Sequence, residues 1–182
     1  KQGHVAGFVK RAELLEGSCL EHLHCFEPEA VVPPTASYQE VVEALDESGL
    51  WFVTFLGEIA GVIQRRDIAK PSVRMWLFGL ITISEMIISD MVERFFPQGS
   101  WQAQLSEDRL EKAKALLAER QRKGQELQLM DCLYLADKAR ILTKDQSIRE
   151  DLGFESRKEA KKAISQLESL RNSLAHAHDI VA

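Results

Sequence analysis

The chain has little cysteine and no apolar targeting segment at its start. Its 3 cysteines among 182 residues, Cys19, Cys25 and Cys132, are too few and too unevenly spaced for a disulfide framework. Their scarcity predicts a reducing, cytoplasmic location. The first residues, Lys1 to His4, contain no initiator methionine and no signal-peptide pattern, so we expect a piece of a longer protein.

The chain also lacks an excess of positive charge. It holds 23 Lys and Arg against 28 Asp and Glu, for a formal net charge of -5. Broad electrostatic capture of nucleic acid is therefore not indicated, and an RNA would have to meet a local patch. Two short basic runs, 120–123 and 157–162, could form such a patch, although both also suit solvated helix faces.

No apolar run is long enough to predict a membrane span. The longest, Met75 to Ile88, has about fourteen residues, whereas a hydrocarbon core of about 30 Å needs roughly 20. We therefore expect a buried helix here and no membrane partner. Glu85 interrupts the run, and a buried carboxylate needs a partner. Arg171 is the expected partner; the alternative is that Glu85 lies on a narrow polar edge of the helix.

The first seventy residues carry strand and helix patterns. The chain as a whole has the composition of an ordinary globular protein, with 45% hydrophobic and 28% charged residues. A helix is expected to end at Ser48-Gly49, and a tight turn at Gly57-Glu58 joins two strands into a hairpin. We expect the first helix over 38–47, the two strands over 50–56 and 59–63, and a second, short helix from about residue 66. The pattern predicts a β-α-β-β-α unit and an α+β fold.

The end of this unit occurs twice. Residues 3–14 align on residues 57–68, which indicates paired modules, the first copy having lost its opening strand, helix and strand. In the second copy, the segment from Gly61 to Asp67 (GVIQRRD) resembles the G-h-h-T/S-x-x-D motif of cystathionine-β-synthase (CBS) domains. The resemblance covers residues 1–70 and implies a partial CBS-domain pair.

CBS pairs typically bind adenosine-containing ligands, so the resemblance implies AMP, ADP or ATP as a regulatory ligand. Asp67 would take the ribose hydroxyls, and the expected ligand-binding set is completed by Gln64, Thr35 and Lys10. Gln64 and Lys10 stand where the family has Thr or Ser, and Glu13 stands where the first motif would have its aspartate. These departures weaken standard AMP binding. Alternatively, Asp67 caps the helix that follows it.

Four possible metal ligands lie within seven residues of one another near the start of the chain. They are Cys19, His22, His24 and Cys25. Structural zinc sites usually draw two ligand pairs from separate elements, and the sequence offers no second pair. We therefore predict no metal site.

From Pro71 onward the pattern is helical. Helices are expected over 73–96, 107–122, 127–140, 145–151 and 156–178. Ser156 and Glu159 form a predicted capping box at the start of the last helix. Long helices joined by short loops predict an antiparallel bundle over residues 71–182.

The last predicted helix carries an arginine, an amide and a histidine in its final turns. An arginine can neutralise a phosphorane, and a histidine can move the proton of a ribose hydroxyl. At helical spacing Asn172, His176 and Asp179 share a face, whereas Arg171 lies roughly 140° round from His176. Only the long arginine side chain or a second subunit could bring the two together. Alternatively, the helix packs one side on the core and keeps these polar residues in solvent on the other. Positive charge near its C-terminus then offsets the helix dipole.

Arg171, Asn172 and His176 resemble the R-N-x-x-x-H signature of HEPN (higher eukaryotes and prokaryotes nucleotide-binding) domains. The resemblance would cover residues 71–182 and implies a small helical bundle that forms a homodimer. Many such domains are metal-independent ribonucleases in toxin or defence systems, in which the arginine, asparagine and histidine of two subunits meet in one cleft. It assigns Arg171, Asn172 and His176 as the catalytic residues; the orienting role we expect for Asp179 comes from its spacing alone.

Together these patterns predict a nucleotide-sensing protein with an endoribonuclease domain that cleaves single-stranded RNA. The CBS-like module, 1–70, would bind an adenine nucleotide, and the HEPN-like bundle, 71–182, would cut without a cofactor. An alternative is a non-catalytic adenine-nucleotide-binding protein whose helical half serves regulation and dimerisation. A third is the partner of a separate nucleotidyltransferase.

Overall fold

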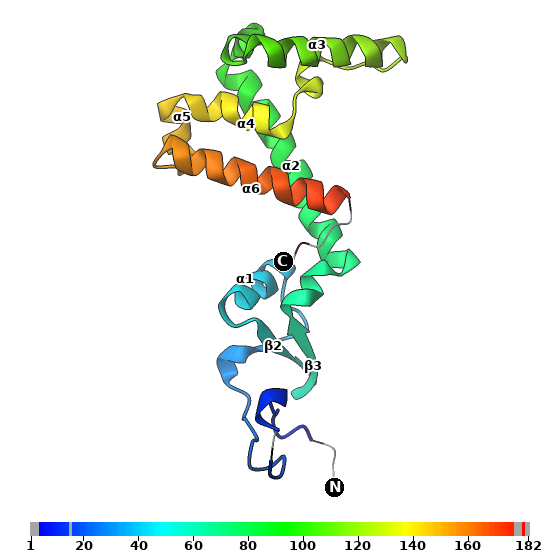
Figure 1. The fold of residues 1–182 in the computed structure, drawn as a ribbon, viewed down its shortest axis with the longest axis vertical. Coiled ribbons are helices and arrows are strands. Elements are labelled where there is room, and N and C mark those ends of the chain that lie inside the picture. Colours follow the sequence, from blue (N-terminus) through cyan, green and yellow to red (C-terminus); the bar gives the residue numbers. More distant parts are fainter. Residues whose placement is uncertain (1–3, 15, 177–179, 181–182) are drawn as a thin grey trace. The chain divides into compact units, whose positions relative to one another are not determined.

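The computed structural model describes residues 4–14, 16–176 and 180, and its fold is mixed α+β, as predicted (Figure 1). The chain divides into two compact units, of which one reaches Trp76 and the other begins at Leu77. Unit 1 contains the β-sheet, whereas the regular elements described in unit 2 are all helices. The division falls within one long helix, α2 (Pro71–Phe95).

Unit 1 is built on a small three-stranded sheet. Its elements in this part of the chain are η2 (Pro28–Ala30), β1 (Val31–Val32), α1 (Tyr38–Ser48), β2 (Leu50–Phe55), β3 (Glu58–Gln64) and η3 (Arg65–Ala69), where η marks a 3-10 helix. β2 lies in the centre, parallel to β1 and antiparallel to β3. The predicted succession of strand, helix, strand, strand and helix is therefore present, with a 3-10 helix as its last member.

Local signals determine both ends of α1. The hydroxyl oxygen of Ser37 accepts the backbone N–H of Glu40 at 3.2 Å, and the Glu40 carboxylate accepts the backbone N–H of Ser37. This reciprocal pair satisfies two amide donors that the first helical turn leaves free. At the other end Gly49 has a φ of 70°, a left-handed conformation that glycine adopts without strain, and the helix ends there as predicted.

The turn between β2 and β3 lies one position earlier than predicted. Its central residues are Leu56 and Gly57, with φ values of 53° and 82°, while Glu58 already belongs to β3 and pairs with Phe55. Two-residue turns with positive φ at both central positions match the twist of paired strands, so the ladder extends to Glu58.

The first copy of the repeat does not form the strand that its alignment with β3 implies. In the described part of this segment, Phe8 makes one antiparallel bridge to His24, and the 3-10 helix η1 (Arg11–Glu13) follows. The ladder does not continue because His24 lies in an irregular segment rather than in a strand. Phe8 instead packs its ring on Phe52 of β2, with 4.8 Å between the ring centroids.

Unit 2 packs helices around an apolar core. Its elements after α2 are η4 (Pro97–Gln104), α3 (Glu107–Arg122), η5 (Leu129–Cys132), α4 (Leu135–Lys144), α5 (Gln146–Asp151) and α6 (Arg157–Ala175). Val92, Trp101 and Ile141 lie in the main cluster, and a smaller cluster of Ala139 and Ile164 joins α4 to α6, which run side by side (Figure 1). Burial of these side chains is the main driving force for the fold of this unit.

The helix predicted over 127–140 is broken in the structure. The Asp131 carboxylate accepts the backbone N–H of Gln128 at 2.8 Å and closes the 3-10 turn η5. Leu133 and Tyr134 then adopt extended backbone conformations, and α4 begins only at Leu135. An aspartate side chain competes with the helix for backbone donors, which is why the propensity pattern misplaced this boundary.

The capping box predicted at α6 is half formed. The Ser156 hydroxyl accepts the backbone N–H of Glu159 at 3.1 Å, so Ser156 is the N-cap, as predicted. The Glu159 carboxylate, however, accepts the backbone N–H of Glu155 instead of that of Ser156. The Glu159 side chain therefore still bonds a backbone N–H before the helix, but that of the residue preceding the N-cap.

The helix predicted over 73–96 is present as α2, but the expectation that its apolar run, Met75 to Ile88, is buried is wrong. α2 has 25 residues, and only Ile81 and Val92 are buried along it. Within the described residues it is long and apolar enough to cross a membrane, and 11% of the 18-residue window concerned is buried. The run was misjudged because the neighbouring helices of unit 2 cover only one side of α2.

The predicted pairing of Glu85 with Arg171 is also wrong. The Glu85 carboxylate lies 3.4 Å from the Nζ of Lys138 on α4, and Lys138 is only 5% exposed. The next residue, Asp137, is 4% exposed and contacts the guanidinium of Arg109 on α3 at 3.3 Å. Consecutive buried charges on α4 therefore bind α2 and α3. The partner of Glu85 comes from a helix whose packing no local pattern revealed.

Candidate functional site

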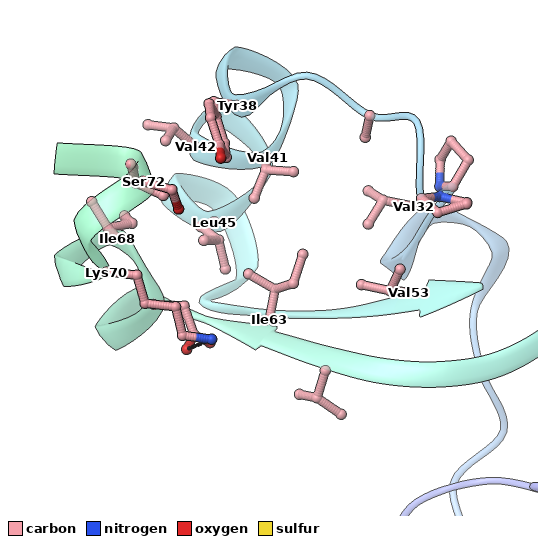
Figure 2. Close-up of a pocket in the computed structure, with 16 residues that line it drawn as sticks. Val32, Tyr38, Val41, Val42, Leu45, Val53, Ile63, Ile68, Lys70 and Ser72 are labelled. Atoms are coloured by element: carbon pink, nitrogen blue, oxygen red, sulfur yellow. Dashed lines mark ion pairs between the residues drawn. The ribbon is translucent and has the colours of Figure 1, made fainter. Parts of the chain in front are cut away.

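Unit 1 contains a cavity of about 250 Å³. It lies between α1, the strands and η3, and the first turn of α2 closes one side of it (Figure 2). Most of its wall is aliphatic: Val32, Val41, Leu45, Val53, Ile63 and Ile68 contribute to it. An apolar wall with few polar groups is the usual composition of a small-molecule site.

The polar groups of the cavity come from η3, α1 and the start of α2. They are Asp67, Lys70, Tyr38 and Ser72. Asp67 and Lys70 form an ion pair, with 3.0 Å between Oδ1 and Nζ, drawn as the dashed line in Figure 2. The Asp67 side chain is 21% exposed and that of Lys70 is 67% exposed. The cavity therefore presents a carboxylate and an ammonium group side by side.

Asp67 makes a capping contact, but not the one that was the alternative to its ligand role: it is the third residue of η3, whose N-cap is Gln64, and does not cap a helix that follows it. Its Oδ2 accepts the backbone N–H of Gln64 at 2.8 Å and closes the first turn of η3. A carboxylate has about four lone-pair sites, so this bond and the contact with Lys70 leave acceptor positions for two hydroxyl donors. The two roles of Asp67 are therefore compatible.

The same contacts lower the pKa of Asp67. The backbone N–H of Gln64 is the largest cause, followed by the hydrogen bond from Lys70, and both favour the charged carboxylate over burial. Because the folded pKa lies below the unfolded value, the resulting stabilisation is present above the unfolded value and is lost as the pH falls through the folded pKa.

A carboxyl-carbon NMR titration is expected to show this directly. The midpoint for Asp67 should lie below the ordinary aspartate value of 3.8. Lys70→Met should move it only part of the way back, because the N–H of Gln64 remains. A wild-type midpoint at or above 3.8 would contradict the geometry of η3.

The other predicted ligand residues do not line the cavity. Gln64 is half-buried at the end of β3, and its neighbour Ile63 contributes to the wall instead. Thr35 is exposed between two wall residues. Lys10 lies 3.9 Å from the carboxylate of Glu13. Of the four, the structure places only Asp67 at the cavity.

Sequence reasoning missed Tyr38, Lys70 and Ser72. A signal was available for Lys70, which follows Asp67 at the i,i+3 spacing of a helical ion pair. No comparable signal identified Tyr38, because the first residue of a surface helix is ordinarily solvated. Its ring lies against that of Trp76, with 5.7 Å between the centroids, a contact that depends on the tertiary structure of unit 1.

The predicted catalytic residues lie at the end of α6. Arg171 and Asn172 are exposed in its last turns, and Arg171 Nη1 donates to the side-chain oxygen of Asn172 at 3.3 Å. His176 is the exposed C-cap residue, and its backbone N–H donates to the carbonyl of Asn172 at 3.0 Å. Asp179, predicted to orient His176, lies outside the described residues. The Asn172 side chain therefore contacts Arg171, whereas its bond with His176 is the backbone bond of the last helical turn.

Among the residues that the structure describes, no carboxylate offsets the charge of Arg171. Its expected partner, Glu85, is occupied by Lys138, and in the described ranges no Asp or Glu lies within ion-pair distance of Arg171. Apart from the Nη1 bond to Asn172, the exposed guanidinium therefore keeps donors for a phosphate.

The cysteine and histidine cluster near the start of the chain has other contacts. His22 shares a hydrogen bond with the carbonyl of Glu16 at 2.8 Å, and His24 contacts the Glu13 carboxylate. The bond with His24 is the largest cause of the lowered pKa of Glu13. Cys19 and Cys25 are free and exposed. Within residues 4–14, 16–176 and 180, no group of three His, Cys, Asp or Glu side chains is placed to hold a metal ion.

No family model, no curated protein and no solved structure matches the chain significantly. The function of the chain is therefore inferred from the residues of the cavity and from those at the end of α6.

Proposed function

We propose that unit 1 binds an adenine nucleotide in its cavity and that this ligand regulates the helical unit. The observation that carries the proposal is the Asp67–Lys70 pair beside an aliphatic cavity. The aliphatic wall would hold the purine base, the Asp67 carboxylate would accept the two ribose hydroxyls, and Lys70 would meet a phosphate. AMP, ADP and ATP are the candidate ligands.

A route for regulation is supported by α2. Ser72 and Val73, in its first turn, line the cavity, and the helix continues past Leu77 into unit 2. A ligand that contacts this turn would bias the helix on which α4 is held by the Glu85–Lys138 pair. Regulation would then need no contact between the ligand and unit 2.

Isothermal titration calorimetry with AMP, ADP and ATP tests the proposed binding, with CMP as a matched ligand lacking the purine. Asp67→Asn keeps an oxygen for the N–H of Gln64 but loses the charge, so we expect affinity to fall by about 10- to 100-fold, as for a lost hydrogen bond to a charged group. Glu47→Gln, an exposed change on α1, should leave affinity unchanged. Equal binding by Asp67→Asn and the wild type would overturn the proposed site.

For unit 2 we propose metal-independent cleavage of single-stranded RNA by a homodimer. The specific support is the exposed group of Arg171, Asn172 and His176, in which the guanidinium meets no carboxylate in the described part of the chain. His176 would take the proton of the ribose 2′-hydroxyl, whose oxygen then forms a bond to phosphorus. Arg171 would stabilise the negative charge on the phosphorane, and Asn172 would position a phosphate oxygen.

The step ends when the bond from phosphorus to the 5′-oxygen breaks. The 5′-oxygen takes up a proton, so the products are a 2′,3′-cyclic phosphate and a free 5′-hydroxyl. Arg171 and His176 diverge around α6, and a second subunit is the simplest way for both to reach one phosphodiester.

The competing function is adenine-nucleotide binding without catalysis, with the helical unit serving regulation and dimerisation. This competing function uses the same nucleotide cavity and differs from the first proposal only in assigning no catalysis to the end of α6. Nucleotide binding by a protein that leaves single-stranded RNA intact, with and without AMP or ATP, would establish it in place of the ribonuclease.

A further inference from the structure

Helix α2 presents an apolar face that the described residues leave exposed. Met75 is 76% exposed, Phe78 47%, Ile83 55% and Met86 63%. Thr82 is also exposed, and Gly79 lies among them on the same side of the helix. Large apolar side chains gathered on one helical face usually mark an interaction surface. We call these six residues the α2 face.

The α2 face has the spacing of a helix-packing seam. Met75, Gly79, Thr82 and Met86 follow one another by four, three and four positions, the spacing of the core positions in a coiled coil. Phe78 and Ile83 flank this seam. A Cβ added at Gly79 would meet nothing within 4 Å outside its own helix. The small residue in the middle therefore leaves room for a side chain from a second helix.

The hydroxyl groups of this stretch are already satisfied within α2. Thr82 donates to the carbonyl of Phe78 at 2.9 Å, Ser84 donates to Leu80 at 2.8 Å, and Ser89 donates to Glu85 at 2.8 Å. A buried hydroxyl costs free energy unless it is bonded. Covering the α2 face would therefore leave none of these hydroxyl donors without an acceptor.

We infer that the α2 face packs antiparallel on the α2 face of a second copy of this chain. A twofold axis midway between Leu80 and Ile81 places Met75 opposite Met86 and Gly79 opposite Thr82. It also places Phe78 opposite Ile83. Every member then meets another member, which is the self-complementarity that a twofold interface requires. The largest side chains of the seam pair at its ends, and the smallest pair in the middle, where the helices approach most closely.

Charge favours the antiparallel over the parallel arrangement. The α2 face is followed by Asp90, which is exposed on the same side of the helix. In the antiparallel pair Asp90 lies near Pro71 of the second copy, where the helix begins and its free N–H groups attract anions. A parallel pair would instead place two Asp90 carboxylates beside each other.

The area available is sufficient for a dimer. The exposed apolar side chains of the face present roughly 500 to 600 Å² per chain, about the size of the largest patch on an ordinary monomer. Two copies would therefore cover roughly 1,000 to 1,200 Å², near the lower limit of a specific interface.

A membrane is the less favourable occupant. Glu85 lies in the middle of the apolar stretch, and its ion pair holds α2 on α4, whose Lys138 is buried with it. Moving α2 into a bilayer would carry this pair into hydrocarbon or break it, at a cost of several kcal/mol. A second copy covers the exposed side of α2 and leaves the pair intact.

Sedimentation velocity on the full chain tests the interface. The wild type is expected to be a dimer, Met86→Glu a monomer, and Ala115→Glu, a matched charge on the exposed side of α3, a dimer. Circular dichroism checks that each variant is folded. A wild type that stays monomeric at the highest concentration reached would overturn the inference, and so would a folded Met86→Glu variant that remains dimeric.

Cysteine cross-linking tests the register independently of any destabilising variant. In a background with Cys19, Cys25 and Cys132 replaced, the Met75→Cys/Met86→Cys double variant is expected to give covalent dimers when copper–phenanthroline oxidises the thiols. Each single variant should not, because like residues then lie roughly 16 Å apart along the helices, too far for a disulfide. Cross-linking of the single variants as efficiently as the double variant would overturn the antiparallel arrangement.

Vesicle flotation separates the membrane from the second copy. We expect wild-type protein to stay in solution with phosphatidylcholine–phosphatidylglycerol vesicles, and flotation that Met86→Glu abolishes would overturn the inference. The inference rests on the homodimer of the proposed function, so a monomeric wild type would overturn both. A folded Met86→Glu variant that remains dimeric would overturn this interface alone, whereas a wild-type dimer that leaves single-stranded RNA intact would overturn the ribonuclease alone.

Discussion

Glu85→Ala is expected to destabilise unit 2 by about 3 kcal/mol, the cost of leaving a buried ion without its partner. Lys138 is 5% exposed, and Glu85 is its carboxylate partner at 3.4 Å. Without Glu85 the ammonium group would remain in a poorly solvated site without this carboxylate. The change should appear as a lower urea midpoint, followed by the far-ultraviolet circular dichroism of the helices.

Two further variants make this expectation specific to the pair. Replacing both partners, as Glu85→Leu with Lys138→Met, should recover most of the loss, because apolar residues of similar size often replace a buried ion pair without cost. Asp108→Ala removes the exposed pair between Asp108 and Lys112 and should cost less than about 1 kcal/mol. If Glu85→Ala cost no more than Asp108→Ala, the ion pair would contribute nothing beyond a surface contact.

His176→Ala is expected to reduce cleavage of single-stranded RNA by about 10²- to 10⁴-fold, the usual contribution of a general acid or base. His176 is exposed at the C-cap of α6, so its removal should leave the helical content unchanged. The measurement is the rate of formation of 2′,3′-cyclic phosphate ends in a metal-free buffer containing chelator.

The controls for this expectation lie on the same chain. His22→Ala, a matched change in unit 1, should cleave at the wild-type rate. Arg171→Lys should retain more activity than Arg171→Ala, because it keeps the charge but loses the forked donors. Equal rates for His176→Ala and the wild type would remove His176 from the mechanism, whereas absence of cleavage in both would favour the non-catalytic protein.

Elements bounded by local signals were predictable. The helix ending at Gly49 and the helix over 107–122 agree with α1 and α3, because capping groups and apolar spacing act within a few residues. The hairpin was also expected, with its turn shifted by one position. Where a polar side chain competed for the backbone, as Asp131 does before α4, the predicted boundary was wrong.

The candidate sites were predictable only in part. Asp67 was singled out, and the structure places it at the cavity, but the cavity itself depends on how α1, η3 and α2 pack together. The contact between Arg171 and Asn172 joins neighbours in sequence, so spacing alone could suggest it. Whether two copies of α6 meet over one RNA strand depends on quaternary structure, which the spacing of residues in one chain does not encode directly.

The sequence by itself determined the α+β class, the order of elements in unit 1 and the polar groups at the end of α6, since each arises from interactions between residues close along the chain. Tertiary structure alone decided that Lys138 rather than Arg171 meets Glu85, that Lys70 and Tyr38 join Asp67 at a cavity, and that one side of α2 is left bare. The physical reason is the same for all three. Ion pairing, cavity shape and solvent exposure depend on which surfaces pack together, and packing joins residues that no local pattern relates.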